Sequence, residues 1–483
     1  MIDCKNYVNG VFIDGSGQTR EVLSPRTGKA IGRFKESTPK DIEQAISYAK
    51  KAAPAWAKTP AKERATLLFK FRNILIRDLD LISAQISDES GKTLAEAKAG
   101  LLKGVEVLEY ALSLQNSDSA GRLQVSRGVF CETRREALGV VAGITPFNFP
   151  AMVPMWMIPI ALAVGNAFVW KPSDKVPLTS NLLARAIEEA GFAPGIFTIL
   201  QGGRESVETL LDHPGISAVG FVGSSPIAKS VYARGTANGK RVLALGGAKN
   251  PIILMPDADP EIATRGIADS FTGCAGQRCM AASVLLAVGE TGALIEGIVE
   301  KARSIRPGKE MGAIISKESL DRLNTSIAKA VSEGARLLLD GRNPEVAPEQ
   351  TGGYWLGPTI LDGITAGSSA ACEEWFGPVI SIVRCKNLSE ALAFEAASAF
   401  GNACSVFTRD GAVAERVASE STAGMIGINV GVPVPREPFS FGGTKISKFG
   451  TGDITGDSGV EFWSQLKKVT TKWADSPDKN WMS

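Results

Sequence analysis

The stretch IFTILQGGRESVETLLDHPGISAVGFVG (residues 196–223) decides the fold class. An apolar run at 196–200 predicts a strand, and apolar residues spaced three and four apart at 205–213 predict a helix. A further apolar run at 217–223 predicts a second strand. Two strands that are joined through a helix at this spacing form a βαβ unit with parallel strands. The stretch therefore predicts an α/β fold whose parallel sheet is covered by helices on both faces.

The same alternation continues in both directions along the chain. TSNLLARAIEEAG (179–191) predicts a helix that Thr179 or Ser180 can cap and that Gly191 can end. A second α/β stretch is predicted from Gly246 onward. The further predicted elements are strands at 139–144, 167–170, 251–255, 283–288, 357–361, 379–383 and 405–408, and helices at 226–236, 262–273 and 292–305.

The two ends of the chain are patterned differently. Residues 41–58 and 62–91 have apolar residues at helical spacing, with Gly91 closing the second segment, so the first third is predicted to be rich in helix. The tail GVEFWSQLKKVTTKW (459–473) alternates and contains β-branched residues, which predicts a strand. Because no partner strand is evident for it, we expect this strand to pair with another subunit.

The composition excludes several classes of protein. The 483 residues are 44% hydrophobic and 22% charged, which is typical of a folded soluble protein with more than one domain. A formal net charge of +2 gives no basic stripe for nucleic acid. The seven cysteines are odd in number and scattered, which fits neither a disulfide framework nor a metal site. We therefore expect a reducing, cytoplasmic location, no metal, and no secretory signal in MIDCKNYVNGVFIDGSG.

One stretch imitates a membrane span, because residues 137–170 carry no charge. Four prolines interrupt it, and a lipid-exposed helix would have to re-satisfy the backbone groups that they free. We expect a buried strand, loop and helix there and no membrane association. The single histidine, His213, precedes Pro214 and is expected to cap a helix, so a multi-histidine zinc site is excluded.

Cys279 has the setting of a nucleophile in GCAGQRC (273–279). Glycines let the backbone approach a substrate closely, and the adjacent Arg278 can stabilise a thiolate. From these residues alone, an inert buried cysteine is the more frequent alternative.

Three other motifs contain residue types that suit a binding site. Asn148 in TPFNFP (145–150) follows a predicted strand, where its amide could meet a developing oxyanion or could satisfy loop backbone. Lys171 and Asp174 in WKPSDK (170–175) could bind ribose hydroxyls or could form a surface ion cluster. Ser224 in FVGSS (221–225) begins a predicted helix that could receive a pyrophosphate, although Ala228 weakens the glycine pattern.

Six motifs occur together in an order and spacing that resemble the aldehyde dehydrogenase superfamily over nearly the whole chain. They are TPFNFP (145–150), KPSD (171–174), FVGS (221–224), LGG (245–247), GQRC (276–279) and EEWFGP (373–378). The resemblance implies a thiohemiacetal at Cys279, hydride transfer to NAD and a thioester acyl-enzyme. It also implies that Asn148 and the Cys279 backbone N–H form the oxyanion hole.

The resemblance further implies a set of cofactor contacts. Lys171 and Glu374 would bind the two riboses, Phe376 would pack by the nicotinamide, and Ser224 would contact the pyrophosphate. Asp174 would favour NAD over NADP, although the family more often has the longer Glu at this position, so its repulsion of a 2′-phosphate would be weaker. The remaining contacts expected are Thr145, Phe147, Lys175 and Gly246, with Phe147 also touching the substrate.

One residue departs from the hydrolytic members of that family. They have a Glu directly before LGG that activates water, and this chain has Ala244. Water needs such a base, whereas a thiol with a pKa near 8.5 does not, so acyl transfer to coenzyme A is favoured over hydrolysis.

The methylmalonate-semialdehyde dehydrogenase branch also lacks this Glu, and this chain resembles it in a further set of motifs. Shared with it are GAKN (247–250), MPDA (255–258), GQRCMA (276–281), INV…PVP (428–435) and GVEF (459–462). The branch implies that Arg278 holds a substrate carboxylate, and that Lys103 stands where a second Arg is expected.

The sequence therefore predicts NAD-dependent oxidation of a malonate- or methylmalonate-type semialdehyde, followed by acyl transfer to coenzyme A with decarboxylation. The alternatives are a hydrolytic aldehyde dehydrogenase that uses another Glu, and a non-catalytic descendant of the fold. The predicted architecture is a Rossmann-like NAD-binding domain, an α/β catalytic domain and a small β arm that joins subunits into a homodimer or homotetramer. The predicted bounds are 1–122, 138–244 and 437–460 for the NAD-binding domain, 245–436 for the catalytic domain, and 123–137 and 461–483 for the arm.

Overall fold

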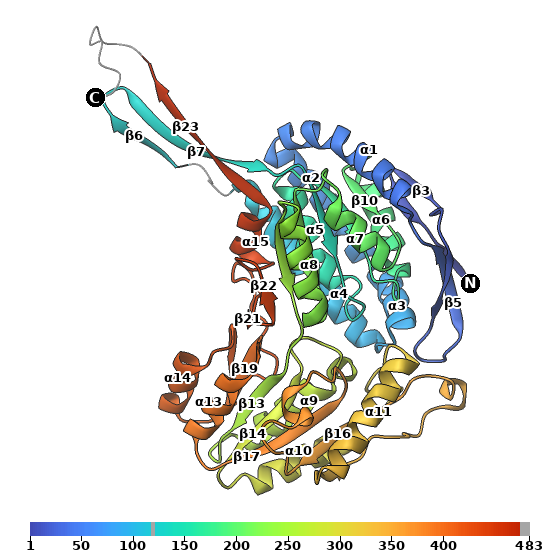
Figure 1. The fold of residues 1–483 in the computed structure, drawn as a ribbon, viewed down its shortest axis with the longest axis vertical. Coiled ribbons are helices and arrows are strands. Elements are labelled where there is room, and N and C mark those ends of the chain that lie inside the picture. The colour runs from blue at the N-terminus through green and yellow to red at the C-terminus, as the bar shows by residue number, and fades with distance from the viewer. Residues whose placement is uncertain (117–120, 474–483) are drawn as a thin grey trace.

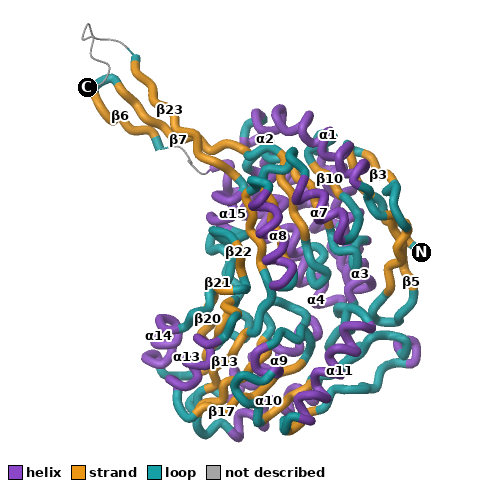
Figure 2. Tube along the Cα trace, viewed as in Figure 1, coloured by secondary structure: helices purple, strands orange, loops and turns teal. Residues whose placement is uncertain are grey.

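The computed structural model describes residues 1–116 and 121–473, and it has the mixed α/β fold expected from the sequence (Figures 1 and 2). Two large sheets, each flanked by helices, form the body, and a three-stranded ribbon projects away from it. Among the helices of these two ranges, none has both the length and the apolar character that a membrane crossing requires.

The first large sheet has eight strands in the order β22-β12-β11-β8-β9-β10-β2-β3. The five strands from β12 to β10 in this order are parallel, and antiparallel strands close both edges. Most of the central residues are buried, which explains their uninterrupted apolar runs. The strands are β2 (Asn6–Val8), β3 (Val11–Ile13), β8 (Val140–Ile144), β9 (Ala167–Lys171), β10 (Phe197–Ile199), β11 (Ala218–Val222), β12 (Arg241–Leu245) and β22 (Lys448–Phe449).

Helices cover this sheet on both faces, and the loops that follow its parallel strands meet at one edge (Figure 1). His213 is the C-cap of α7, as expected. The helices are α1 (Pro39–Lys58), α2 (Ala61–Arg77), α3 (Leu79–Ser90), α4 (Leu94–Ser113), α5 (Met152–Ala163), α6 (Leu178–Ala190), α7 (Arg204–Asp212) and α8 (Ser225–Ala237).

Two details of the helices differ from the expectation. The segment 62–91 forms two helices that are separated at Asp78, although Gly91 closes the second in the left-handed conformation with φ 77°. Neither Thr179 nor Ser180 caps α6. Instead, the carboxylate of the buried Glu89 accepts hydrogen bonds from the backbone N–H groups of Leu178 (2.6 Å) and Thr179 (2.9 Å). A side chain from another helix satisfies these groups, which local sequence could not reveal.

The second large sheet has the order β15-β16-β17-β14-β13-β19-β20, and only the β15–β16 pair is antiparallel. Its strands are β13 (Asn250–Leu254), β14 (Ala282–Val288), β15 (Arg336–Leu339), β16 (Thr359–Asp362), β17 (Val379–Cys385), β19 (Ala403–Phe407) and β20 (Met425–Ile428). The flanking helices are α9 (Pro260–Thr272), α10 (Gly292–Arg303), α11 (Lys317–Ser332), α12 (Ser369–Cys372), α13 (Leu388–Ala397) and α14 (Gly411–Glu420).

The projecting ribbon consists of β6 (Arg122–Ser126), β7 (Val129–Ala137) and β23 (Ser464–Lys472). The tail was expected to be a strand from residue 459, but α15 (Gly456–Phe462) is helical and the strand begins only at Ser464. Residues 123–137 were expected to share an arm with this tail, and β23 does pair with β7 from Ser464↔Ala137 to Lys472↔Val129, so the tail strand has a partner within its own chain. Residues 474–483 of the predicted arm lie outside the described residues.

Two small sheets complete the fold. The N-terminal one has the order β1-β5-β4, formed by β1 (Ile2–Cys4), β4 (Thr19–Leu23) and β5 (Ala30–Lys35). The other pairs β18 (Phe400–Gly401) with β21 (Thr444–Lys445). The N-terminal sheet lies beside α6, because Leu178 packs in one cluster with Cys4, Val22 and Phe34.

Candidate active site

The loop after α9 holds Cys279, and its backbone is fixed from two other strands. The carbonyl of Cys279 accepts hydrogen bonds from the side-chain amides of Asn250 (2.7 Å) and Asn402 (2.8 Å). Gln277 ties the same loop to the chain beyond it, since its amide donates to the carbonyl of Ala313 (2.9 Å) and accepts from the N–H of Ile315 (2.9 Å). The thiol is therefore held in a defined position.

The start of this loop makes a tight turn that few residues tolerate. Cys274 and Ala275 have backbone φ angles of 55° and 52°, which residues other than glycine rarely adopt. Gly276 also has a positive φ, and a Cβ there would lie 2.1 Å from the carbonyl oxygen of Gly377. The turn is held by Glu96 of α4, which accepts a hydrogen bond from the N–H of Cys274 (2.5 Å).

A cavity of about 340 Å³ brings many of the predicted site residues together. The cavity is lined by Cys279, by loops at the edge of the first large sheet, and by Glu374 and Phe376, which precede β17 of the second large sheet. Phe147 and Phe376 pack edge to face across it, with ring centroids 5.8 Å apart. The predicted residues that line it are Phe147, Asn148, Ser224, Gly246, Cys279, Glu374 and Phe376.

The environment of Cys279 does not stabilise a thiolate as the sequence suggested. Burial of the thiol raises its pKa to about 12, the negative charge of Glu374 adds to the effect, and Arg278 opposes it only in part. Asn148 is buried, and among the described residues its side-chain amide has no hydrogen-bond partner. The amide is therefore free to donate to an oxygen that forms next to the sulfur.

Glu374 is folded inward in this structure. Its carboxylate accepts a hydrogen bond from the N–H of Ala248 (2.8 Å), and burial raises its pKa. Gly247 leaves room for it, because a Cβ there would lie 2.2 Å from Glu374 Oε2. The buried Lys249 lies with its ammonium 5.3 Å from the Trp375 ring, and its pKa is lowered to about 8, mainly by burial.

The predicted cofactor residues fit a dinucleotide. Lys171 at the end of β9 is 5% exposed, and no hydrogen bond or ion pair of its ammonium lies within the described ranges. Ser224 is the N-cap of α8, and its side chain makes no capping hydrogen bond. A buried unpaired cation and an unblocked helix N-terminus suit ribose hydroxyls and a pyrophosphate.

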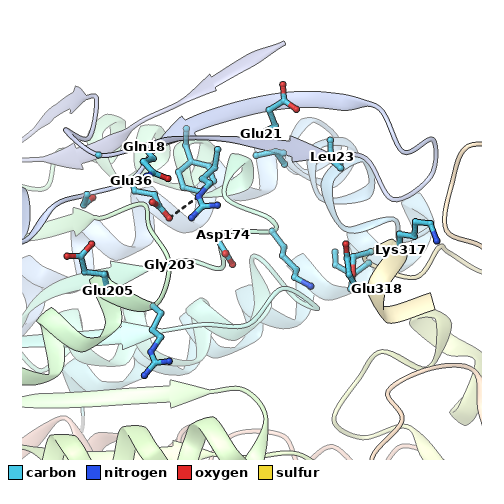
Figure 3. Close-up of a pocket in the computed structure, with 18 of the residues that line it drawn as sticks. Gln18, Glu21, Leu23, Glu36, Asp174, Gly203, Glu205, Lys317 and Glu318 are labelled. Carbon is cyan, nitrogen blue, oxygen red and sulfur yellow. Dashed lines mark hydrogen bonds and ion pairs between the residues drawn. The ribbon is translucent and has the colours of Figure 1, made fainter. Parts of the chain in front are cut away.

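The other predicted cofactor residues lie nearby in different settings. Thr145 is buried, and its hydroxyl accepts a hydrogen bond from the indole of Trp170 (2.8 Å). Asp174 and Lys175 are exposed and line a larger cavity of about 850 Å³, shown in Figure 3. The ammonium of Lys175 lies 5.6 Å from the Phe147 ring.

A third cavity, of about 540 Å³, lies on the other side of the nucleophile loop. It is lined by Arg278 and Phe149, whose chain neighbours Cys279 and Asn148 line the first cavity. The Arg278 guanidinium donates to the carbonyls of Asp269 (2.5 Å) and Ser270 (3.0 Å), and its Nε is buried without a partner.

The structure does not bring Lys103 into either cavity at the nucleophile loop. Its ammonium pairs with the carboxylates of Glu106 (2.9 Å) and Glu437 (3.2 Å). Two carboxylates therefore already neutralise this cation.

Sequence reasoning missed the two asparagines that hold Cys279, Asn250 and Asn402. Each directly precedes or begins a buried apolar strand, and a polar residue in such a place was the available signal. Ala244 is fully buried in β12, in a cluster with Phe221 and Val242. Over residues 1–116 and 121–473 there is no group of His, Cys, Asp and Glu side chains that could hold a metal ion.

Comparison with known proteins identifies the family. The model of the aldehyde dehydrogenase family matches residues 12–469. This chain belongs to the aldehyde dehydrogenase family. Among similar members, malonate-semialdehyde dehydrogenase 1 of Geobacillus kaustophilus is 40% identical over 97% of each chain. Malonate-semialdehyde dehydrogenase of Pseudomonas aeruginosa is 39% identical over 97% of this chain and 96% of its own.

Solved structures of the aldehyde dehydrogenase family agree with the fold. A protein from Sinorhizobium meliloti, named for methylmalonate-semialdehyde dehydrogenase and solved in complex with NAD, has a TM-score of 0.96 at 37% identity and covers 99% of both chains. The methylmalonate-semialdehyde dehydrogenase of Oceanimonas doudoroffii has the same TM-score and coverage at 36% identity. The resemblance drawn from the sequence motifs is therefore confirmed at the level of the family.

Proposed function

We propose that this aldehyde dehydrogenase oxidises a carboxylate-bearing semialdehyde of the malonate or methylmalonate type with NAD, and passes the acyl group from Cys279 to coenzyme A with loss of CO₂. One observation carries the proposal. Among the described residues, the cavity that Cys279 and Asn148 share has Glu374 as its only carboxylate. The names of the similar proteins support the same substrate class.

The first step is the addition of the Cys279 sulfur to the aldehyde carbon. The thiol loses its proton, the C–S bond forms, and the carbonyl π electrons move to the oxygen. The free amide of Asn148 and the backbone N–H of Cys279 are the donors we assign to that oxygen, and one such donor is typically worth about 10²–10³ in rate. NAD supplies a hydride acceptor when bound, and Lys171, Ser224 and Glu374 are the residues we assign to holding it.

The second step is removal of the acyl group from Cys279. A thiolate of coenzyme A can attack the thioester carbonyl without a base, and the Cys279 thiolate leaves. Water requires proton abstraction by a group in the cavity. The carboxylate on the α-carbon of the thioester departs as CO₂, because the electron pair it leaves is delocalised into the thioester carbonyl, and the resulting enolate takes a proton from water to give the acetyl group.

The substrate carboxylate is assigned to the cavity behind the nucleophile loop. Arg278 lines that cavity. Only its Nη2 donates to the carbonyls of Asp269 and Ser270, so its other N–H groups can donate to a substrate carboxylate. Guanidinium binds carboxylates well. Because Lys103 is already paired with two carboxylates, we assign the charge recognition to Arg278.

The hydrolytic alternative now has a specific candidate base, which is Glu374. Its raised pKa would suit proton abstraction. The test is NADH formation from malonate semialdehyde and NAD, with and without coenzyme A, together with product analysis. We expect sustained turnover and acetyl-CoA only when coenzyme A is present. Equal turnover without coenzyme A, giving free acid as the product, would establish hydrolysis instead.

We also propose the domain division and the arm that the sequence suggested. The arrangement of the two large sheets and the projection of β6, β7 and β23 from the body support it (Figure 1). Dimer or dimer-of-dimers assembly through the ribbon is part of the same proposal.

A further inference from the structure

Glu36 is fixed beside the edge of the first sheet where the adenosine half of the cofactor is expected. It follows β5, its N–H donates to the carbonyl of Gln18 (2.9 Å), and its own carbonyl accepts from Gly17 (2.8 Å). The next N–H, that of Ser37, donates to the carbonyl of Gln201 just after β10 (2.8 Å). The backbone at Glu36 is therefore held on both sides.

The side chain of Glu36 lies at the same cavity as Asp174. Both line the hollow of about 850 Å³, and Figure 3 shows them on its walls. Glu36 Oε1 lies 3.3 Å from where a Cβ on Gly203 would be, at the start of α7. Asp174 and Glu36 are also the two charges that act on the buried ammonium of Lys171.

Lys171 and Asp174 are the residues we assign to a ribose of the cofactor. NADP differs from NAD in a phosphate on one ribose hydroxyl, so a carboxylate beside that hydroxyl repels NADP. Asp174 is short and exposed, so its repulsion through solvent is weak. Glu36 supplies a second negative charge on the facing wall, and only 23% of its side chain is exposed.

Glu36 also forms an ion pair with Arg20, a cation that could otherwise bind the 2′-phosphate of NADP. Arg20 of β4 lines the same cavity, and its Nε lies 3.3 Å from Glu36 Oε1. A free guanidinium binds phosphate well. While it is paired with Glu36, Arg20 is held on a carboxylate of its own chain.

We propose that Glu36 selects NAD over NADP, by placing a second carboxylate beside Asp174 and by holding Arg20. The inference rests on the proposed NAD-dependent function and adds a specificity-determining residue to it. Removing the carboxylate both lowers the repulsion and releases Arg20 toward the phosphate.

The test measures binding of the adenosine end alone, so that it does not depend on turnover. Calorimetry gives the Kd of 5′-AMP and of 2′,5′-ADP for the wild type, Glu36→Gln, and the double variant Glu36→Gln/Arg20→Gln. We expect Glu36→Gln to shift the preference toward 2′,5′-ADP by about tenfold. The double variant should show a smaller shift toward 2′,5′-ADP, because it lacks the Arg20 guanidinium that could bind the phosphate. The ratio of kcat/KM for NAD and NADP should shift in the same direction.

The matched control is Glu21→Gln, which removes the same charge from a neighbouring residue of β4 that also borders the cavity. Glu21 points away from the hollow (Figure 3), so its removal should leave the nucleotide preference unchanged. An unchanged preference in Glu36→Gln, or an equal shift in Glu21→Gln, overturns the inference while leaving the proposed oxidation intact. If the wild type binds neither nucleotide, the proposed cofactor site falls, and the inference falls with it.

Discussion

At the scale of single residues, the state of Cys279 decides the chemistry, and its reactivity can be measured without any substrate. Burial and Glu374 raise the pKa of the thiol to about 12, so little thiolate exists at neutral pH. In the free enzyme, alkylation of Cys279 by iodoacetamide should therefore accelerate about tenfold for each pH unit between about 7 and 10. Glu374→Gln should speed the reaction at any fixed pH, because it removes a negative charge, and Arg278→Gln should slow it.

Peptide mass spectrometry makes that measurement specific, since Cys372 is exposed and would react as well. A rate at Cys279 that does not depend on pH would show that the thiol is already ionised. A slower reaction in Glu374→Gln would show that this carboxylate assists the thiolate rather than opposing it.

At the scale of elements, Glu89 links α3 to the start of α6 and introduces a pH dependence of stability. Burial raises its pKa to about 7, above its usual value near 4.5, so the folded state favours the protonated form. Its contribution to the free energy of unfolding is full below about pH 4.5 and is lost as the pH rises through about 7. The difference corresponds to roughly 3 kcal/mol. Urea unfolding from pH 4.5 to 8 should show a smaller fall in Glu89→Gln than in the wild type, and equal profiles would contradict this role.

The ribbon is the element whose removal tests the proposed assembly. In the full chain, β23 pairs with β7 along its whole length. A chain truncated after Phe462 lacks β23 and therefore exposes that edge of β7. We expect monomers or aggregates by light scattering. A chain truncated after Trp473 keeps β23 and is the matched control. The same oligomer from both truncations would show that the ribbon does not hold subunits together.

The elements also show where sequence reasoning is sufficient. The parallel strands were predictable because both faces are buried and their apolar runs are continuous. The capping of α6 by Glu89 and the break at Asp78 depend on contacts between distant segments. The motifs pointed to Cys279 and Asn148, whereas Asn250 and Asn402 hold Cys279 through hydrogen bonds between distant segments, and only their place at the start of buried strands was a local signal.

In the molecule as a whole, the nucleophile loop lies between two cavities. The cofactor is assigned to the side of Cys279, Asn148 and Glu374, and the substrate carboxylate to the side of Arg278. In the proposed mechanism, the buried Ala244 supplies no carboxylate to activate water, so the acyl group passes to a thiol. This claim distinguishes the proposed enzyme from a hydrolytic member of the same family.

The most direct test is the mass of intact enzyme after malonate semialdehyde and NAD are added without coenzyme A. The account predicts a single burst of NADH, an acetyl adduct that persists on Cys279, no adduct in Cys279→Ala, and release of the adduct as acetyl-CoA when coenzyme A is added. A malonyl adduct would place decarboxylation after the transfer. Continuous NADH formation with unmodified Cys279 would contradict the central claim, because water would then be the acyl acceptor.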